Sequence, residues 1–116
     1  MVKINTSEFG SITIDNKKYP HDVYIFPSGK VEERPHSHSI SKDQVEHILK
    51  ENSDLEVIFI GKGTSGMASL DADARELLEK KGIEIIEANT PDIKDKFNEL
   101  ADKRKKKIAA IIHTTC

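Results

Sequence analysis

The sequence predicts a three-layer α/β fold, built on a mixed sheet that opens with an antiparallel meander and continues with parallel strands. Two observations support this fold class. Short apolar stretches separated by turn residues fill the first third of the chain, as in strands joined by hairpins. Beyond it, helical apolar spacing alternates with continuous apolar runs, the α-β-α-β-α-β pattern of parallel strands joined by helical crossovers. The 116 residues have the size of one domain, so we expect a single α/β domain over residues 1–116.

The predicted meander occupies the first 34 residues. Residues 9–14 alternate apolar with small or polar side chains, and Asp15-Asn16 is typical of a turn in which Asn tolerates a positive φ. A second strand is expected over residues 22–26, ended by Pro27-Ser28-Gly29, and a third over residues 30–34. Because the turns are short, neighbouring strands should be antiparallel.

The first helix is predicted by a change of period after residue 40. Ser41 with Gln44 three residues later is typical of a capping box, so we expect a helix over residues 42–51. Residues 57–60 are continuously apolar, which predicts a strand covered on both faces.

The second helix is expected to begin after a cap at Asp71 or Ser69. It should end before Gly82, because the residue beyond a helix end often adopts a left-handed conformation. A further strand is predicted over residues 83–87.

The third helix is predicted by Thr90-Pro91, an N-cap followed by proline at the first helical position. Residues 108–112 are apolar throughout and predict the last strand. The basic run over residues 103–107 lies between them, and we interpret it as cations complementing the helix dipole.

The composition excludes several function classes. With 18 basic and 20 acidic residues the net charge is -2, and aromatic residues make up 5%, which argues against a nucleic-acid binder. No apolar run is long enough to cross a membrane, and the first residues do not resemble a signal peptide. Cys116 is the single cysteine, so we expect a reducing, cytoplasmic location. Enrichment in Lys and Glu predicts an archaeal or thermophilic source.

A candidate site follows from the parallel strands, since ligands bind beyond their carboxyl ends. Residues 61–69, 88–90 and 113–116 should meet at that edge. The candidate ligand-binding residues are Gly61, Gly63, Thr64, Ser65, Gly66, Thr90, His113, Thr114 and Cys116.

Residues 61–66 match the pattern G-x-G-x-x-G after a predicted strand, and Glu87 ends the next strand. Such glycines let backbone amides approach a pyrophosphate, and the acid can bind a ribose hydroxyl. Residues 67–70 separate the last glycine from the expected cap at Asp71, unlike a dinucleotide motif, which opens its helix inside the glycine run. The alternatives are a dinucleotide site, a small anion or phosphate site, and a turn that needs glycine for its backbone conformation.

Two further clusters have alternative interpretations. His113 and Cys116 could form a nucleophilic pair, but a carboxylate at the same residue would raise the pKa of the Cys116 thiol, so a structural or docking role is preferred. His36 and His38 would share one face of an extended segment and could both reach a zinc ion, with His47 a helix away. We interpret that segment as a polar loop and expect no metal and no cofactor.

The sequence resembles the Mth-domain family. The resemblance is carried by residues 9–14, Tyr19, residues 22–23, 57–63 and 82–83, Thr90 and residues 109–116. This group includes small archaeal proteins of unknown function, the adipogenesis-associated Mth-domain protein and a mitochondrial complex I assembly factor. The resemblance implies a three-layer α/β fold with a mixed sheet, and no enzymatic activity that could be carried over. Its eukaryotic members look like assembly or regulatory factors.

We therefore expect a non-enzymatic domain that binds a protein partner or a small, anionic ligand at the strand edge. It would be a monomer or a weak homo-oligomer, with no nucleic-acid or membrane partner. The alternative is an enzyme, or a phosphate- or nucleotide-ligand binder, that uses the loop of residues 61–66 with His113 as acid or base. No residue is assigned as catalytic.

Overall fold

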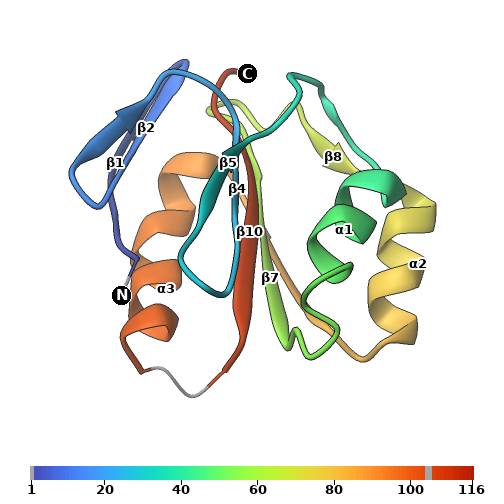
Figure 1. The fold of residues 1–116 in the computed structure, drawn as a ribbon. Coiled ribbons are helices and arrows are strands. Elements are labelled where there is room, and N and C mark those ends of the chain that lie inside the picture. The colour runs from blue at the N-terminus through green and yellow to red at the C-terminus, as the bar shows by residue number, and fades with distance from the viewer. Residues whose placement is uncertain (1, 104–105) are drawn as a thin grey trace.

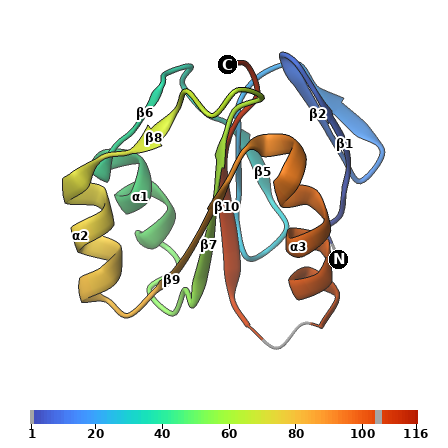
Figure 2. The same ribbon diagram turned by 180° about the vertical axis from the view of Figure 1, so that it is seen from behind.

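A five-stranded mixed sheet lies at the centre of the computed structural model, which describes residues 2–103 and 106–116 (Figures 1 and 2). Its strand order is β5-β4-β10-β7-β9. The strands are β4 (Val23–Ile25), β5 (Val31–Glu33), β7 (Val57–Lys62), β9 (Glu84–Ala88) and β10 (Ile108–His113). β10 runs parallel to β7 and antiparallel to β4, and β7 runs parallel to β9. The predicted mixed sheet is thus confirmed, including its parallel last strand.

Two layers cover the faces of this sheet. Helices α1 (Lys42–Leu49) and α2 (Ala72–Lys80) lie on one side of it, and α3 (Thr90–Lys103) lies on the other (Figure 1). Beside α3 stands a separate three-stranded sheet of β1 (Ile4–Glu8), β2 (Ser11–Ile14) and β3 (Lys17–Tyr19). The protein therefore has the three layers that the sequence predicts.

The first third of the chain divides between two sheets, and this corrects the continuous meander that we expected. β1, β2 and β3 pair only with one another, whereas β4 and β5 form a hairpin within the central sheet. The predicted strand over residues 9–14 begins only at Ser11, because Phe9-Gly10 forms the turn from β1 to β2. The turn at Asp15-Asn16 is confirmed, with φ of 50° and 66°. β1 and β3 were missed because their mostly polar, exposed residues lack an apolar pattern.

The helix ends differ in detail from the predicted caps. Ser41 caps α1, since its side chain accepts a hydrogen bond from the Gln44 amide at 3.3 Å. The Gln44 side chain does not close a capping box, because its Oε1 accepts a bond from Arg34 Nε at 2.8 Å. Asp71 stands at the N-cap of α2, but its carboxylate accepts from the Ser39 hydroxyl at 2.7 Å.

Other boundaries shift by a few residues. α1 ends at Leu49, not at Glu51, and Gly82 follows the end of α2 with a positive φ as predicted. Ser69 belongs to a short unpredicted strand rather than to a cap. That strand, β8 (Ser69–Leu70), pairs in parallel with β6 (Ser39–Ile40).

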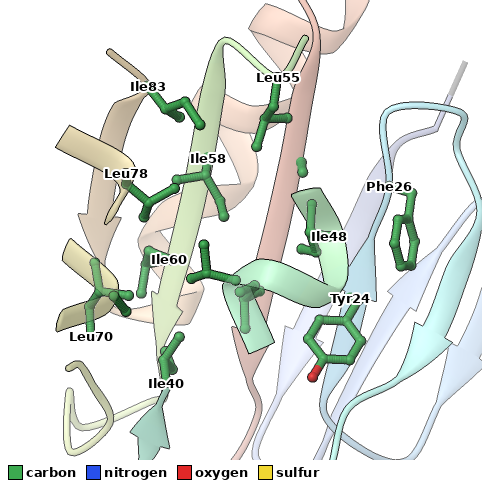
Figure 3. Packing of buried hydrophobic residues seen from close by; sticks show 14 of the residues in the cluster. Tyr24, Phe26, Ile40, Ile48, Leu55, Ile58, Ile60, Leu70, Leu78 and Ile83 are labelled. Atoms are coloured by element: carbon green, nitrogen blue, oxygen red, sulfur yellow. The ribbon is translucent and has the colours of Figure 1, made fainter. Parts of the chain in front are cut away.

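Alternating residues of the central strands fill two apolar cores. On one face, Ile58 and Ile60 of β7 pack with Leu78 of α2 and Ile48 of α1 (Figure 3). On the other face, Phe59 of β7 meets Phe97 of α3 edge-on, with ring centroids 5.3 Å apart. Both faces of β7 and β10 are buried, which explains their continuous apolar runs.

Part of the basic run near the end of α3 lies outside the described residues, namely Arg104 and Lys105. Lys103 is the last residue of α3, and its Nζ lies 3.2 Å from a carboxylate oxygen of Glu99 one turn earlier. Within the described ranges, no helix combines the length and the apolar character needed to cross a membrane.

Candidate functional site

The predicted strand edge is present, since the three parallel strands of the central sheet end side by side. In their register, Gly61 on β7 lies between Ile112 of β10 and Ala88 of β9. The segments beyond these ends carry seven of the nine candidate residues, and Gly61 and His113 lie at the ends of β7 and β10. The edge surrounds the chain end marked C in Figure 1.

Thr90 connects all three segments through its hydroxyl. The hydroxyl accepts a hydrogen bond from the Gly63 amide at 2.9 Å and donates one to the His113 carbonyl at 2.6 Å. Thr90 is the first residue of α3 and is buried. Its side chain therefore holds the edge together instead of serving as the predicted helix cap.

Replacing Thr90 with valine keeps the shape of the side chain but removes both hydrogen bonds. We expect the free energy of unfolding to fall by about 2 kcal/mol, because a buried amide and a buried carbonyl lose their partner. Urea denaturation checks this value. The matched control is Thr64→Val at a half-buried position, which removes a single long hydrogen bond of 3.3 Å to the Thr115 carbonyl. An equal loss in both variants would contradict the linking role of Thr90.

The glycine loop is closed by the last residues of the chain. The Thr64 amide donates to the Thr115 carbonyl at 2.7 Å, and the amides of Ser65 and Met67 both donate to the Cys116 carbonyl, at 3.3 and 2.8 Å. Gly63 adopts a φ of +94°, and a Cβ there would lie 2.4 Å from the carbonyl carbon of Cys116. The loop conformation is thus explained by packing against residues 115–116.

This geometry does not favour a nucleotide in the loop. A phosphate would have to displace residues 115–116 from the same amides, and the loop leads into β8 rather than into a helix. Glu87, the candidate ribose ligand, pairs with Arg75 at 2.6 Å. Gly66 lies in the loop beside Asn89.

A buried ion pair next to the edge was not foreseen from the sequence. Oδ2 of Asp22 accepts hydrogen bonds from Arg34 Nη1 at 2.6 Å and from His113 Nδ1 at 2.7 Å. Oδ1 accepts from the amide and the hydroxyl of Thr114, at 2.8 and 2.9 Å. The side chains of Asp22, Arg34 and His113 are fully buried, so one carboxylate joins two candidate residues to a buried cation.

Arg34 extends this network to the loop between β5 and α1. Its Nη2 donates to the carbonyls of Ser37 and Ser39, both at 2.9 Å, and its Nε donates to Gln44. The guanidinium thereby fixes the loop that carries His36 and His38. Among the described residues, every buried side-chain nitrogen and oxygen has a partner.

The electrostatic surroundings keep Asp22 ionised. Burial alone would raise its pKa, but hydrogen bonds from Thr114 and His113 outweigh this effect and hold the pKa of Asp22 below its ordinary value. Burial lowers the pKa of Arg34, while the neighbouring Asp22 opposes that change.

The lowered pKa of Asp22 predicts a loss of stability in acid. In the unfolded chain Asp22 binds its proton at a higher pH, so its contribution to stability is complete above about pH 5. That contribution falls away as the pH drops through the lower pKa of the folded state. We expect Asp22→Asn to lose less stability than the original chain between pH 5 and 2, as measured by urea midpoints. Parallel curves for the two proteins would contradict this assignment.

The hydrogen bonds of His113 define its proton positions. Because an ionised carboxylate only accepts, Nδ1 of His113 carries the hydrogen toward Asp22. Nε2 lies 3.1 Å from the Thr115 hydroxyl, which donates to it when the ring is neutral. Both ring nitrogens are engaged with Asp22 and Thr115, so the alternative in which His113 pairs with Cys116 is not formed. The arrangement is instead a hydroxyl, an imidazole and a carboxylate in line.

The exposed imidazole rings of His36 and His38 lie next to the buried ring of His113. The ring centroids of His36 and His38 lie 5.2 and 5.1 Å from that of His113, and 6.4 Å from each other. Nδ1 of His36 approaches Oδ2 of Asp22 at 3.9 Å. His47 packs instead against Tyr24 and pairs with Glu32.

Asp22 and Arg34 were missed because we followed only the carboxyl ends of the parallel strands. β4 is antiparallel to β10, so it enters the sheet at this edge and β5 ends there. Charged residues immediately before β4 and after β5 were the available signal. A charged residue just before the first strand of a predicted hairpin and another just after its second strand would have indicated Asp22 and Arg34.

The chain belongs to the family described as a protein of unknown function (DUF498/DUF598), whose model matches residues 4–113. It is similar to the conserved hypothetical protein PH1505 from Pyrococcus horikoshii OT3, with 36% identity, a TM-score of 0.86 and coverage of 98% and 99% of the two chains. It also shares its fold with MT938, at 24% identity, a TM-score of 0.80 and full coverage of both chains.

A third structure extends the comparison to bacteria. A Bordetella pertussis protein described as a Mth938-like domain is 14% identical, with a TM-score of 0.76 and coverage of 97% of this chain and 85% of that one. No curated protein matches the sequence. The resemblance to the Mth-domain family is confirmed, as is its unknown function. A thermophilic source and a cytoplasmic location stay predictions.

Proposed function

We propose that this protein is a non-enzymatic binding domain that engages a partner protein at the carboxyl edge of its parallel strands. One observation carries the proposal. Phe9 and Met67 are the exposed large hydrophobic side chains of the described residues, at 66% and 60% exposure, and both adjoin residues 114–116. The Gly10 amide beside Phe9 donates to the Thr114 carbonyl at 2.9 Å, and the Met67 amide donates to the Cys116 carbonyl.

The character of these residues supports a protein partner. Single exposed apolar side chains are common, but Phe and Met are enriched at the centres of protein interfaces. Here they flank one short segment whose backbone is already held by the loop and the β1–β2 turn. A partner would therefore meet an ordered surface and would lose little conformational entropy on binding.

A second candidate is acid–base chemistry at His113, favoured by the alignment of the Thr115 hydroxyl, the imidazole and Asp22. A carboxylate that orients an imidazole makes it an effective proton acceptor for a hydroxyl. This candidate depends on the imidazole and not on the glycine loop, whose amides bind residues 115–116. Hydrolysis of activated esters that is lost in Thr115→Val would support it.

Site-specific photo-crosslinking in the native cells tests the binding proposal. A photoreactive phenylalanine replaces Met67, and the control carries it at exposed Asp54, which precedes β7 at the opposite edge. We expect a discrete adduct with a partner protein from position 67 and none from position 54. Phe9→Ser should weaken the adduct, since both side chains flank the same segment.

Two results would overturn the proposal. Equal adduct patterns from positions 67 and 54 would show that the edge is not a specific surface. An adduct between two copies of this chain would show that the edge mediates self-association and does not bind a different partner protein.

A further inference from the structure

We propose that His36, His38 and His113 form a binding site for a divalent transition-metal ion such as zinc. This site goes beyond the proposed partner surface and does not depend on it. Sequence spacing offers only two neighbouring imidazoles, His36 and His38. The structure adds the third, His113, from the end of β10.

The distances of His36 and His38 from His113 each fit one shared ion. An imidazole nitrogen binds zinc at about 2.0–2.1 Å, which places the centres of two tetrahedrally arranged rings roughly 5 Å apart. His113 lies 5.2 Å from His36 and 5.1 Å from His38 between ring centroids. The remaining separation of 6.4 Å lies between His36 and His38, whose exposed side chains can rotate inward.

The ligand on His113 would be Nε2, because Nδ1 is held by Asp22 at 2.7 Å. Histidines that bind metals usually donate their second ring hydrogen to a carboxylate or carbonyl, which fixes the tautomer and orients the ring. The half-buried Thr115 hydroxyl, 3.1 Å from Nε2, would give up that bond to the ion. Three imidazoles leave a fourth position for water or an added ligand.

Asp22 orients the site and is not a ligand itself. Single ligand atoms of Asp22, His36 and His113 lie within 4.8 Å of one another, so a carboxylate ligand is the alternative to compare. However, Oδ2 of Asp22 already accepts from Arg34 at 2.6 Å. Transferring that oxygen to a metal would leave a fully buried guanidinium without its counter-charge. An all-imidazole site favours zinc, copper, nickel or cobalt over magnesium or calcium.

The ion pair between Asp22 and Arg34 also positions the loop that carries the other two ligands, His36 and His38. Arg34 binds the carbonyls of Ser37 and Ser39, which follow His36 and His38 in the chain. The buried pair thus fixes His113 on one side and the loop of the exposed imidazoles on the other. The exposed rings leave the site accessible from solvent.

Metal titration of the full chain, after treatment with a chelator, tests this site. We expect one Co²⁺ per chain with visible bands of tetrahedral cobalt, and no thiolate charge-transfer band, since Cys116 is not a ligand. Zn²⁺ should displace the cobalt in calorimetry. His36→Asn and His38→Asn should each weaken binding by more than ~100-fold, beyond the range expected for loss of a residue that only hydrogen-bonds to a ligand. His47→Asn, at another exposed histidine, should not change it.

The proposal is overturned by any of three results. These are no saturable binding of either metal, unchanged affinity in both loop variants, or an equal loss in His47→Asn. Because His36 and His38 are exposed, their variants should keep the thermal unfolding midpoint of the metal-free protein, which separates ligand loss from unfolding. The cross-linking experiment uses neither residue, so either proposal can fail alone.

Discussion

Asp22→Asn is expected to lower the free energy of unfolding by about 3–5 kcal/mol at neutral pH. The change keeps the size of the side chain but removes the only carboxylate that Arg34 contacts among the described residues. A fully buried guanidinium then has no counter-charge, and the hydrogen bond from His113 loses its ionised acceptor. Urea denaturation at pH 7 measures the loss.

A matched control and a double variant define this effect. Glu99→Gln removes the exposed pair with Lys103 and should have little effect, because solvent screens such pairs. Asp22→Asn combined with Arg34→Met removes both charges and should be less destabilised than the sum of the single changes. Strict additivity would show that the two side chains do not depend on each other.

Gly63→Ala is expected to cost about 2–5 kcal/mol, the sum of a strained backbone and a steric overlap. The backbone at this glycine has a φ of +94°, which disfavours any residue with a Cβ. The added methyl group would also lie 2.4 Å from the carbonyl carbon of Cys116. Thermal and urea unfolding of the variant measure the combined loss.

Gly10→Ala separates the two contributions. Gly10 has a similar φ of +84°, but a Cβ there meets nothing within 4 Å. Its alanine variant should therefore lose only the backbone part, about 1–2 kcal/mol. If both variants lose the same amount, residues 115–116 do not pack against the loop as described.

The central sheet could be predicted because its signals are local. The apolar runs of β7 and β10 reflect burial on both faces, and Gly82 marks the end of α2 from its own conformational preference. β1 and β3 of the separate sheet lacked such a signal. The polar residues of β3 are mostly exposed, and nothing nearby shows which sheet they join.

Only part of the candidate site could be predicted, because some of its contacts join residues that are distant in the sequence. Parallel strands bring His113 and the glycine loop to one edge by rule, and the structure agrees. The bond between Asp22 and His113 spans 91 residues and depends on β4 entering the sheet antiparallel at that edge. In the sequence, His36 and His38 have no neighbouring third imidazole, and only the fold brings His113 beside them.

The four bonds to Asp22 also bear on how the edge moves. One carboxylate holds the start of β4, the residue after β5 and the end of β10, so none of these can separate without breaking a shared contact. The Thr114 amide and the loop fixed by Arg34 should therefore become open to hydrogen exchange in a single cooperative event. Phe9 and Met67, which flank residues 114–116, and the imidazoles of His36, His38 and His113 then belong to one unit of local stability. A ligand that orders one of these groups would also order the other.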